Sequence, residues 1–201
     1  LNRIVEWNEA MHLPEALHNI EQWMRQQENA ATKITEQILQ VNSFSHFLAV
    51  IFGIGILTGI GEEMIFRGVL QRIVQDKNHR AYVAVWICAF LFSAIHLQFY
   101  GFIPRLLLGA FFGYLLVWSK NLWLPIFAHL FNNSTVACIS YFTNDKSPDN
   151  LIETIGTSGS PTSWLAGASL IGTVILLYVL YKKVFASKSK EFFPMEDKIT
   201  P

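Results

Sequence analysis

Three ionisable side chains, Glu62, Glu63 and Arg67, lie close together in one of the most apolar regions of this 201-residue chain. A charged side chain at the centre of a bilayer costs ~2.5–3.5 kcal/mol on insertion scales, so such residues are expected to have a partner or a function. Glu63 and Arg67 have the i, i+4 spacing that places both on one face of a helix, and we predict that they pair. Glu62 points about 100° away around that helix and has no local cation.

Two later apolar segments carry polar residues at the same spacing, because His96 follows Phe92, and Asn133 follows His129, at i+4. Hydrolysis of an amide bond needs a base that activates water, donors for the developing oxyanion, and an acid for the leaving amine. Glu62 can transfer the proton, and either imidazole can share it. The Asn133 amide can donate to an oxyanion. These residue types predict one buried site for hydrolysis, formed by three separate helices.

The ordered motifs Glu-Glu-x-x-x-Arg, Phe-x-x-x-His and His-x-x-x-Asn resemble the CPBP family, which comprises type II CAAX prenyl endopeptidases and bacteriocin-processing (Abi) intramembrane proteases. The similarity runs from about Phe44 to Phe142. The residues that flank the first motif, Gly61 and Gly68 to Gln71, also look like those of bacterial members. The resemblance implies an intramembrane endopeptidase that acts on a membrane-bound protein or lipidated peptide. It implies no particular substrate.

The resemblance also implies a role for each motif residue. Glu62 and His96 are expected to activate a water molecule. His129 and Asn133 are expected to hold the oxyanion. The predicted catalytic residues are Glu62, Glu63, His96, His129 and Asn133. Arg67 and Phe92 are the predicted supporting residues.

Metal dependence is a separate question, because members of this family are often called metalloproteases. The chain has no His-Glu-x-x-His pair, which is the strong zinc-protease signal. Glu63, His96 and His129 could nevertheless supply three ligands of an open zinc site. We favour a water-activating glutamate with no required cofactor, and zinc or another divalent metal is the alternative.

Two other functions are compatible with buried acids and histidines. Such residues also build proton relays, so one alternative is a proton- or ion-coupled membrane transporter. Spans broken at corresponding positions of two halves, which are typical of transporters, are not evident. The other alternative is a non-catalytic bacteriocin-immunity or scaffold protein of the membrane.

The composition predicts that these segments lie in a bilayer. Hydrophobic residues make up 52% of the chain and charged residues 15%, with a mean hydropathy of +0.32. This is too little charge for an ordinary soluble surface. The 15 basic and 15 acidic residues balance, so the basic face required for a nucleic-acid partner is absent. Composition does not indicate an oligomeric state.

Apolar runs near the ~20 residues that span a bilayer as a helix predict an all-α fold, a polytopic transmembrane helical bundle. The runs are Phe44 to Ile60, Ala81 to Leu97, Phe102 to Trp118, Leu122 to Phe142 and Trp164 to Tyr181. Gly53, Gly55, Gly59 and Gly61 are expected to let helices approach closely. At ~1.5 Å per residue, His96 is roughly 24 Å from Arg80, so we expect a later start or a strong tilt for its helix, or helix boundaries that differ from those of the apolar run.

The chain divides into five predicted regions. Residues 1–43 form an amphipathic N-terminal helical segment, in which Leu13, Leu17 and Ile20 recur at helical spacing. This segment is expected to lie on the membrane surface or to pack on the bundle, and a soluble helical hairpin is the alternative. The others are a protease core (44–142), an acidic solvent loop (143–163), a C-terminal transmembrane helix (164–185) and a polar tail (186–201). Because the chain begins at Leu1, we expect further segments upstream.

Basic residues between the apolar runs predict the orientation. They fall on one side of the membrane when the spans are counted, and the positive-inside rule makes that side cytoplasmic. They are Arg72, Lys77, Arg80, Lys120, Lys182, Lys183, Lys188 and Lys190. We therefore expect a bacterial cytoplasmic-membrane protein with a cytoplasmic C-terminus.

Overall fold

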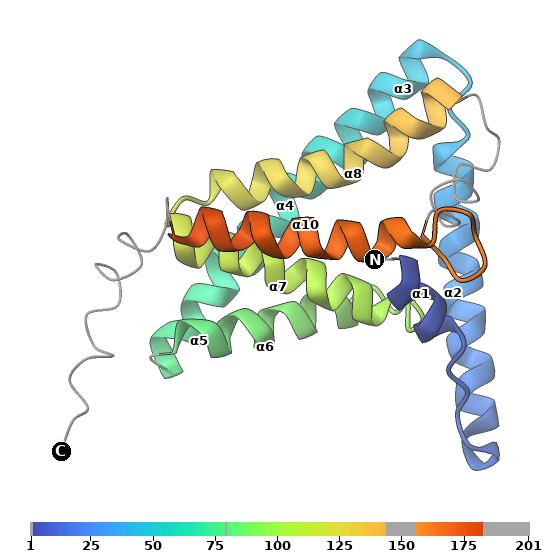
Figure 1. Cartoon of the computed structure of the whole chain (residues 1–201), viewed down its shortest axis with the longest axis horizontal. Helices are drawn as coiled ribbons and strands as arrows, with labels where there is room; N and C mark the ends of the chain where they lie inside the picture. The colour runs from blue at the N-terminus through green and yellow to red at the C-terminus, as the bar shows by residue number, and fades with distance from the viewer. Residues whose placement is uncertain (1, 79, 144–155, 183–201) are drawn as a thin grey trace.

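The computed structural model describes residues 2–78, 80–143 and 156–182, and the regular elements in these ranges are helices (Figure 1). The predicted all-α fold is confirmed. The elements are α1 (Asn2–Glu9), η1 (Glu15–Leu17), α2 (His18–Leu39), α3 (Phe44–Val50), η2 (Ile51–Leu57), α4 (Thr58–Glu63), η3 (Met64–Leu70), α5 (Gln71–Asn78), α6 (Ala81–Ala94), α7 (Phe102–Ser119), α8 (Trp123–Thr143) and α10 (Trp164–Leu180).

Residues Phe44 to Asn78 form one helical rod, in which two π-helical segments, η2 and η3, flank α4. The rod begins after Ser43, whose hydroxyl oxygen accepts a hydrogen bond from the His46 backbone N–H at 3.2 Å. Serine is a preferred residue at this capping position. π-Helical turns are rare overall, and those that occur are often at functional sites. The acidic pair Glu62 and Glu63 lies in α4, between the two π-helical segments.

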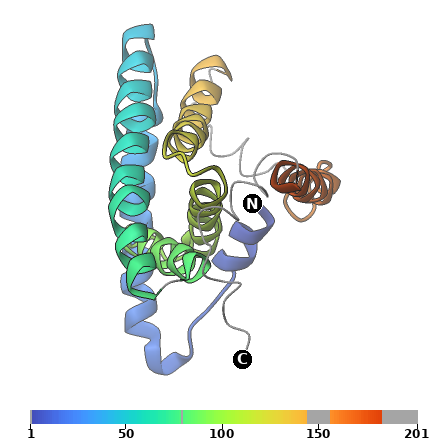
Figure 2. The same ribbon diagram turned by 90° about the vertical axis from the view of Figure 1, so that its left-hand side faces the viewer.

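Helices α6 and α8 pack beside the rod, and Arg67 and Gln71 of the rod donate hydrogen bonds to backbone carbonyl oxygens of α7. The contact between α6 and α7 is built from alanine and valine side chains, namely Ala81, Val85, Ala89, Ala110 and Val117. α8 packs on η2, α4 and α7. Figure 2 shows the rod on one side of the molecule, α7 and α8 next to it, and α10 at the opposite edge. The three segments that carry the motifs therefore converge on one interior.

Close helix approach at the rod depends on two of the four glycines predicted for it. A Cβ atom on Gly59 would lie 3.2 Å from the Leu130 backbone nitrogen of α8, so only glycine fits there without displacing a main chain. Gly55 likewise lies against the Ser134 side chain. The prediction is wrong for Gly53 and Gly61, because no atom lies within 4 Å of a Cβ built at either position. These two glycines face outward from the helix contact.

Two helices among the described residues are long and apolar enough to cross a membrane, Phe44–Gln75 and Phe102–Ser119. Ala81–Ala94 and Trp164–Val179 are shorter apolar helices. Large apolar side chains on the outside of these helices are exposed, as expected for contact with lipid, and they include Phe52, Leu57, Phe90, Leu170 and Ile171. The fold is a polytopic membrane bundle.

The C-terminal regions are described only in part. α10 covers Trp164–Leu180 of the predicted helix at 164–185. Residues 144–155 of the predicted loop and the whole predicted tail at 186–201 lie outside the described residues.

The N-terminal segment packs on one end of the bundle, and α2 runs across that end in Figure 1. Buried Asn8 of α1 donates from its side-chain amide to the Phe99 carbonyl oxygen at 3.0 Å and also to the Tyr100 carbonyl oxygen. At the far end of α2, the Ser140 hydroxyl donates to the Leu39 carbonyl oxygen at 2.5 Å. These hydrogen bonds join both ends of the N-terminal segment to the bundle.

The chain between α1 and α2 is held by one carboxylate. Glu21 accepts hydrogen bonds from the Leu13 backbone N–H at 2.9 Å and from Arg25 at 2.9 Å, and it contacts His12 at 3.0 Å. The bond to His12, followed by those to Leu13 and Arg25, lowers the pKa of the Glu21 carboxyl to about 2. Glu21 therefore stays ionised and ties the segment between α1 and α2 to the first turns of α2.

The two glycine environments predict opposite effects of one substitution. Gly59→Ala should lower the free energy of unfolding by about 1–3 kcal/mol, because the added methyl group overpacks against the α8 backbone. Gly53→Ala is the matched control and should be neutral or slightly stabilising, because alanine favours a helix where space is open. Thermal unfolding of both variants in the same detergent measures the difference. Equal melting temperatures would contradict the proposed close contact.

Candidate active site

The predicted pair of Glu63 and Arg67 is present and fully enclosed. Arg67 Nη1 donates to Glu63 Oε1 at 2.9 Å, and the two side chains are 1% exposed for Arg67 and 0% exposed for Glu63. The i, i+4 spacing on the rod brings the two groups together, as the sequence predicts.

Arg67 also connects the rod to α7. Its Nη2 donates to the Gly109 carbonyl oxygen at 2.7 Å. The guanidinium lies 4.8 Å from the ring centroid of Phe92 and 5.6 Å from that of Phe112, distances typical of cation–π contacts. Gly109 permits this approach, because a Cβ there would lie 3.1 Å from Phe92 Cδ1. The two terminal nitrogens of this buried cation thus have a carboxylate and a carbonyl acceptor and lie near aromatic faces, whereas its buried Nε has no acceptor among the described residues.

Glu63 orients His129 of α8. His129 Nδ1 lies 2.8 Å from Glu63 Oε1. An ionised carboxylate only accepts hydrogen bonds, so the partner assigns the proton to Nδ1. Phe112 stacks on the imidazole with ring centroids 4.8 Å apart and planes 22° apart. The ring is therefore fixed, and Nε2 is its available nitrogen.

His96 is oriented in the same way by a backbone group. Its Nδ1 lies 2.7 Å from the Phe92 carbonyl oxygen, which can only accept, so Nδ1 carries the proton and Nε2 is available. The prediction that His96 lies within a helix is wrong, because α6 ends at Ala94 and His96 occupies the turn that follows. Phe92 supports both imidazoles, with edge contacts at 5.1 Å to His96 and 5.9 Å to His129.

The orientation of the rod explains how His96 reaches the same level of the bundle as Glu62. We expected a late start or a strong tilt for the helix of His96, but α6 begins at Ala81, the first residue of the predicted apolar run. The late start is therefore wrong, whereas the strong inclination between the rod and α6 in Figure 1 agrees with the tilt. The inclination brings Glu62 to the C-terminal end of α6.

Glu62 faces both imidazoles. Its Oε1 lies 3.9 Å from His96 Nε2, and its Oε2 lies 3.8 Å from His129 Nε2. These separations exceed a hydrogen bond, but a water molecule can lie within hydrogen-bond distance of both atoms of either pair. Glu62 and His96 are 25% and 27% exposed, whereas His129 is 4% exposed. The three groups thus form an accessible face of an otherwise buried site.

A cavity of about 380 Å³ opens onto this face. Its walls also include Asn132 and Asn133 of α8, Thr58 of α4, Arg105 of α7 and Val5 of α1. Asn133 Nδ2 donates to the Ile54 carbonyl oxygen at 3.2 Å, which leaves its second N–H for a ligand.

The structure brings Glu62, His96, His129 and Asn133 to one cavity and places Glu63 and Arg67 behind it. Sequence reasoning did not assign Arg105 to the site. This residue follows Pro104 at the start of an apolar run, where a cation is ordinarily an interfacial anchor. Val5 carries no sequence signal at all, because its position depends on how α1 docks.

The predicted ligand set of Glu63, His96 and His129 does not assemble. Glu63 Oε1 is engaged by Arg67 and by His129 Nδ1, whereas the free Nε2 of His129 faces Glu62 instead. Among the described residues, no group of three histidine, cysteine or acidic side chains has the arrangement of a metal site. Glu63 is therefore not placed to act as a third ligand beside the Nε2 atoms of His96 and His129.

Breaking the buried pair should be more harmful than neutralising both partners. Arg67→Met leaves the Glu63 carboxylate buried without a cation and should lower the free energy of unfolding by about 3–5 kcal/mol. The double variant Glu63→Gln with Arg67→Met should recover much of that loss, because the glutamine is neutral and its carbonyl oxygen can still accept from His129. Denaturant unfolding in micelles measures both. A double variant as unstable as Arg67→Met would refute the pairing argument.

Comparison with known proteins agrees with the motifs. Residues 44–135 match the family described as type II CAAX prenyl endopeptidase Rce1-like. The uncharacterized protein YpbD of Bacillus subtilis (strain 168) is 28% identical over 109 residues, which cover 52% of this chain and 51% of the relative. The chain thus spans about half the length of that curated relative. No solved structure matches. Residues 44–135, which hold all the predicted catalytic residues, therefore form a domain of the Rce1-like type II CAAX prenyl endopeptidase family.

Proposed function

We propose that this protein is an intramembrane endopeptidase that hydrolyses a peptide bond in a membrane-bound protein or lipidated peptide. The family domain supports a peptidase. The observation that carries the proposal is the position of Glu62, whose carboxylate faces the available Nε2 atoms of His96 and His129 at 3.9 and 3.8 Å in an open cavity.

In the first step Glu62 acts as the general base. It accepts a proton from the water held between its carboxylate and the Nε2 of His96. The water oxygen forms a bond to the carbonyl carbon of the substrate, and the carbonyl oxygen becomes an oxyanion. His96 Nε2 is a second acceptor for the same proton, because its Nδ1 is committed to the Phe92 carbonyl.

The oxyanion is stabilised by Asn133 and His129. Asn133 donates its second N–H, while its first stays on the Ile54 carbonyl. A neutral His129 with its proton on Nδ1 has no proton on Nε2, so His129 donates to the oxyanion only as an imidazolium. Glu63, at 2.8 Å from Nδ1, supports that charged form. Glu63 thus acts on the reaction through His129.

In the second step the tetrahedral intermediate collapses. The carbonyl double bond forms again, the carbon–nitrogen bond breaks, and the amine nitrogen takes the proton held by Glu62 or His96. The products are a carboxylic acid and an amine, and no other reactant is consumed. We propose that this cycle needs no metal, since the histidine and glutamate donors do not form a three-ligand centre with Glu63.

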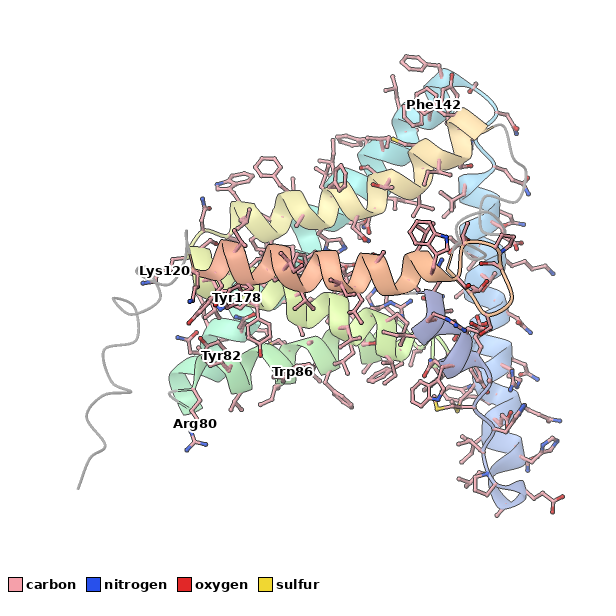
Figure 3. All side chains as sticks on the ribbon, viewed as in Figure 1. Arg80, Tyr82, Trp86, Lys120, Phe142 and Tyr178 are labelled. Carbon is pink, nitrogen blue, oxygen red and sulfur yellow. The ribbon has the colours of Figure 1, made fainter. Side chains whose placement is uncertain are left out.

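We propose that the end of the bundle opposite α2 is cytoplasmic and that the protein lies in a bacterial cytoplasmic membrane. Figure 3 shows Arg80 and Lys120 at that end, and Arg72 and Lys182 belong to the same predicted basic group. The C-terminus is then cytoplasmic, and α1 and α2 lie outside.

Removal of the general base should abolish cleavage. With the purified protein in lipid nanodiscs and a pool of acylated peptides, Glu62→Gln and His96→Ala should each lower the cleavage rate by about 10²–10⁴-fold. Mass spectrometry of the peptides measures the products. Glu36→Gln and His18→Ala make the same chemical changes at exposed positions of α2 and should leave the rate unchanged.

Unchanged cleavage by Glu62→Gln would refute the proposed mechanism. Proton flux in the same nanodisc lipids, reconstituted as vesicles, tests the transporter alternative. A flux that is lost in Glu62→Gln, in a protein that cleaves no peptide, would favour transport over hydrolysis.

Metal removal should not affect the reaction. After dialysis against a strong zinc chelator, the wild-type protein should keep its cleavage rate within about twofold, because Glu62 rather than a bound metal activates the water. Metal content by plasma mass spectrometry verifies the removal. Loss of cleavage that added zinc restores would instead establish a metalloprotease.

A further inference from the structure

Arg105 of α7 lines the same cavity as Glu62 and His96, and the proposed reaction does not use it. Its Nη2 donates to Gln98 Oε1 at 2.5 Å. Its Nη1 is buried and has no hydrogen-bond partner among the described residues. The guanidinium lies against Gly101, where a Cβ would come within 3.3 Å of Nη2. Arg105 thus lines the cavity, and one nitrogen of its guanidinium is enclosed there without an acceptor.

The acidic residues near Arg105 do not accept a hydrogen bond from its Nη1. Glu28 of α2 lies within electrostatic range of Arg105, but its Oε2 accepts from the Tyr100 backbone N–H at 3.0 Å. Burial raises the pKa of the Glu28 carboxyl, and the bond from Tyr100 opposes that rise. Glu62 also lies within electrostatic range, and no hydrogen bond joins it to Arg105 among the described residues. Both acids balance the charge of Arg105 without occupying its donors.

A comparison with Arg67 shows what a structural arginine looks like in this bundle. Both Nη groups of Arg67 have a protein acceptor, Glu63 and the Gly109 carbonyl, and only its Nε, which lies next to the side-chain stem, has none among the described residues. Arg105 has an acceptor on Nη2 alone among the described residues, and it borders a cavity instead of a packed interior. Buried donors without a partner are rare in folded proteins, and a ligand atom is one explanation.

On the basis of the proposed function, we propose that Arg105 is a carboxylate-binding subsite of the cavity. It binds a carboxylate of the substrate, either the C-terminus of the peptide or an aspartate or glutamate side chain. A guanidinium fork matches a carboxylate in shape and charge, and the resulting hydrogen bonds are strong. Because Glu62 repels a second carboxylate and Arg105 attracts one, the carboxylate of the substrate is directed to Arg105. The substrate is thereby held in one register relative to Glu62.

Binding of defined peptides tests the subsite without requiring cleavage. The probes are palmitoylated random hexapeptides without aspartate or glutamate, made with either a free C-terminal carboxylate or a C-terminal amide. A third, amidated pool contains one glutamate at each position in turn. Each pool is retained on the Glu62→Gln protein in nanodiscs and quantified by mass spectrometry. At least one carboxylate-bearing pool should bind about tenfold more tightly than the neutral amide pool.

The preferred pool identifies the source of the carboxylate. Preference for the free-acid pool indicates the C-terminus, and preference for the glutamate pool indicates an internal side chain. When Arg105→Gln is added to the Glu62→Gln protein, the ratio of the affinities for the carboxylate-bearing and neutral pools should fall to about one. Binding of the neutral pool should be unchanged. Arg105→Lys keeps the charge without the fork and should retain part of the preference, so it serves if Arg105→Gln does not fold.

Two outcomes would overturn the subsite. One is equal binding of all pools by the protein that retains Arg105, and the other is an equal loss for charged and neutral pools in Arg105→Gln. Glu28→Gln is the control for a merely structural charge pair and should leave the preference intact. If the wild-type protein cleaves no peptide, the proposed hydrolysis is contradicted but the carboxylate subsite is not. The reason is that the binding preference is measured on a protein without the general base.

Discussion

The buried Glu63–Arg67 pair is the interaction on which the rest of the site depends. An ion pair that is removed from water is stable only if further hydrogen bonds satisfy the remaining donors and acceptors. Those bonds come from other elements of the bundle: Gly109 in α7 accepts from Arg67, and His129 in α8 contacts Glu63. One pair on the rod therefore sets the relative positions of the rod, α7 and α8.

The pair also determines which chemistry His129 offers. Its Nδ1 is committed to Glu63, so Nε2 is directed to the cavity, and the Phe92 carbonyl has the same effect on His96. Two imidazoles with matching tautomers then face Glu62. The division of labour between neighbouring glutamates follows from their environments: the enclosed one orients a histidine, and the exposed one is available for proton transfer.

Two features of the backbone make this convergence possible. π-Helical segments on both sides of α4 surround the turn that carries the glutamates, and Gly59 lets α8 approach that turn at backbone distance. Without a side chain at Gly109, α7 comes close enough to α6 for its carbonyl to reach Arg67. The outer surface, in contrast, is covered by exposed apolar side chains that suit a lipid environment. Specific packing is thus concentrated around the polar centre.

The sequence alone determined the helical class, the Glu63–Arg67 pair and the membership of Glu62, His96, His129 and Asn133 in one site. The first two inferences rest on apolar length and on i, i+4 spacing, which are local properties of a helix, whereas the common site rests on the chemistry of amide hydrolysis and on the resemblance to the CPBP family. Only the tertiary structure decided that His96 lies after α6, that Glu63 binds Arg67 and the Nδ1 side of His129, and that Arg105 borders the cavity. Each of these depends on helix inclination and on hydrogen bonds between distant segments, and neither is encoded in the spacing of residues along one helix.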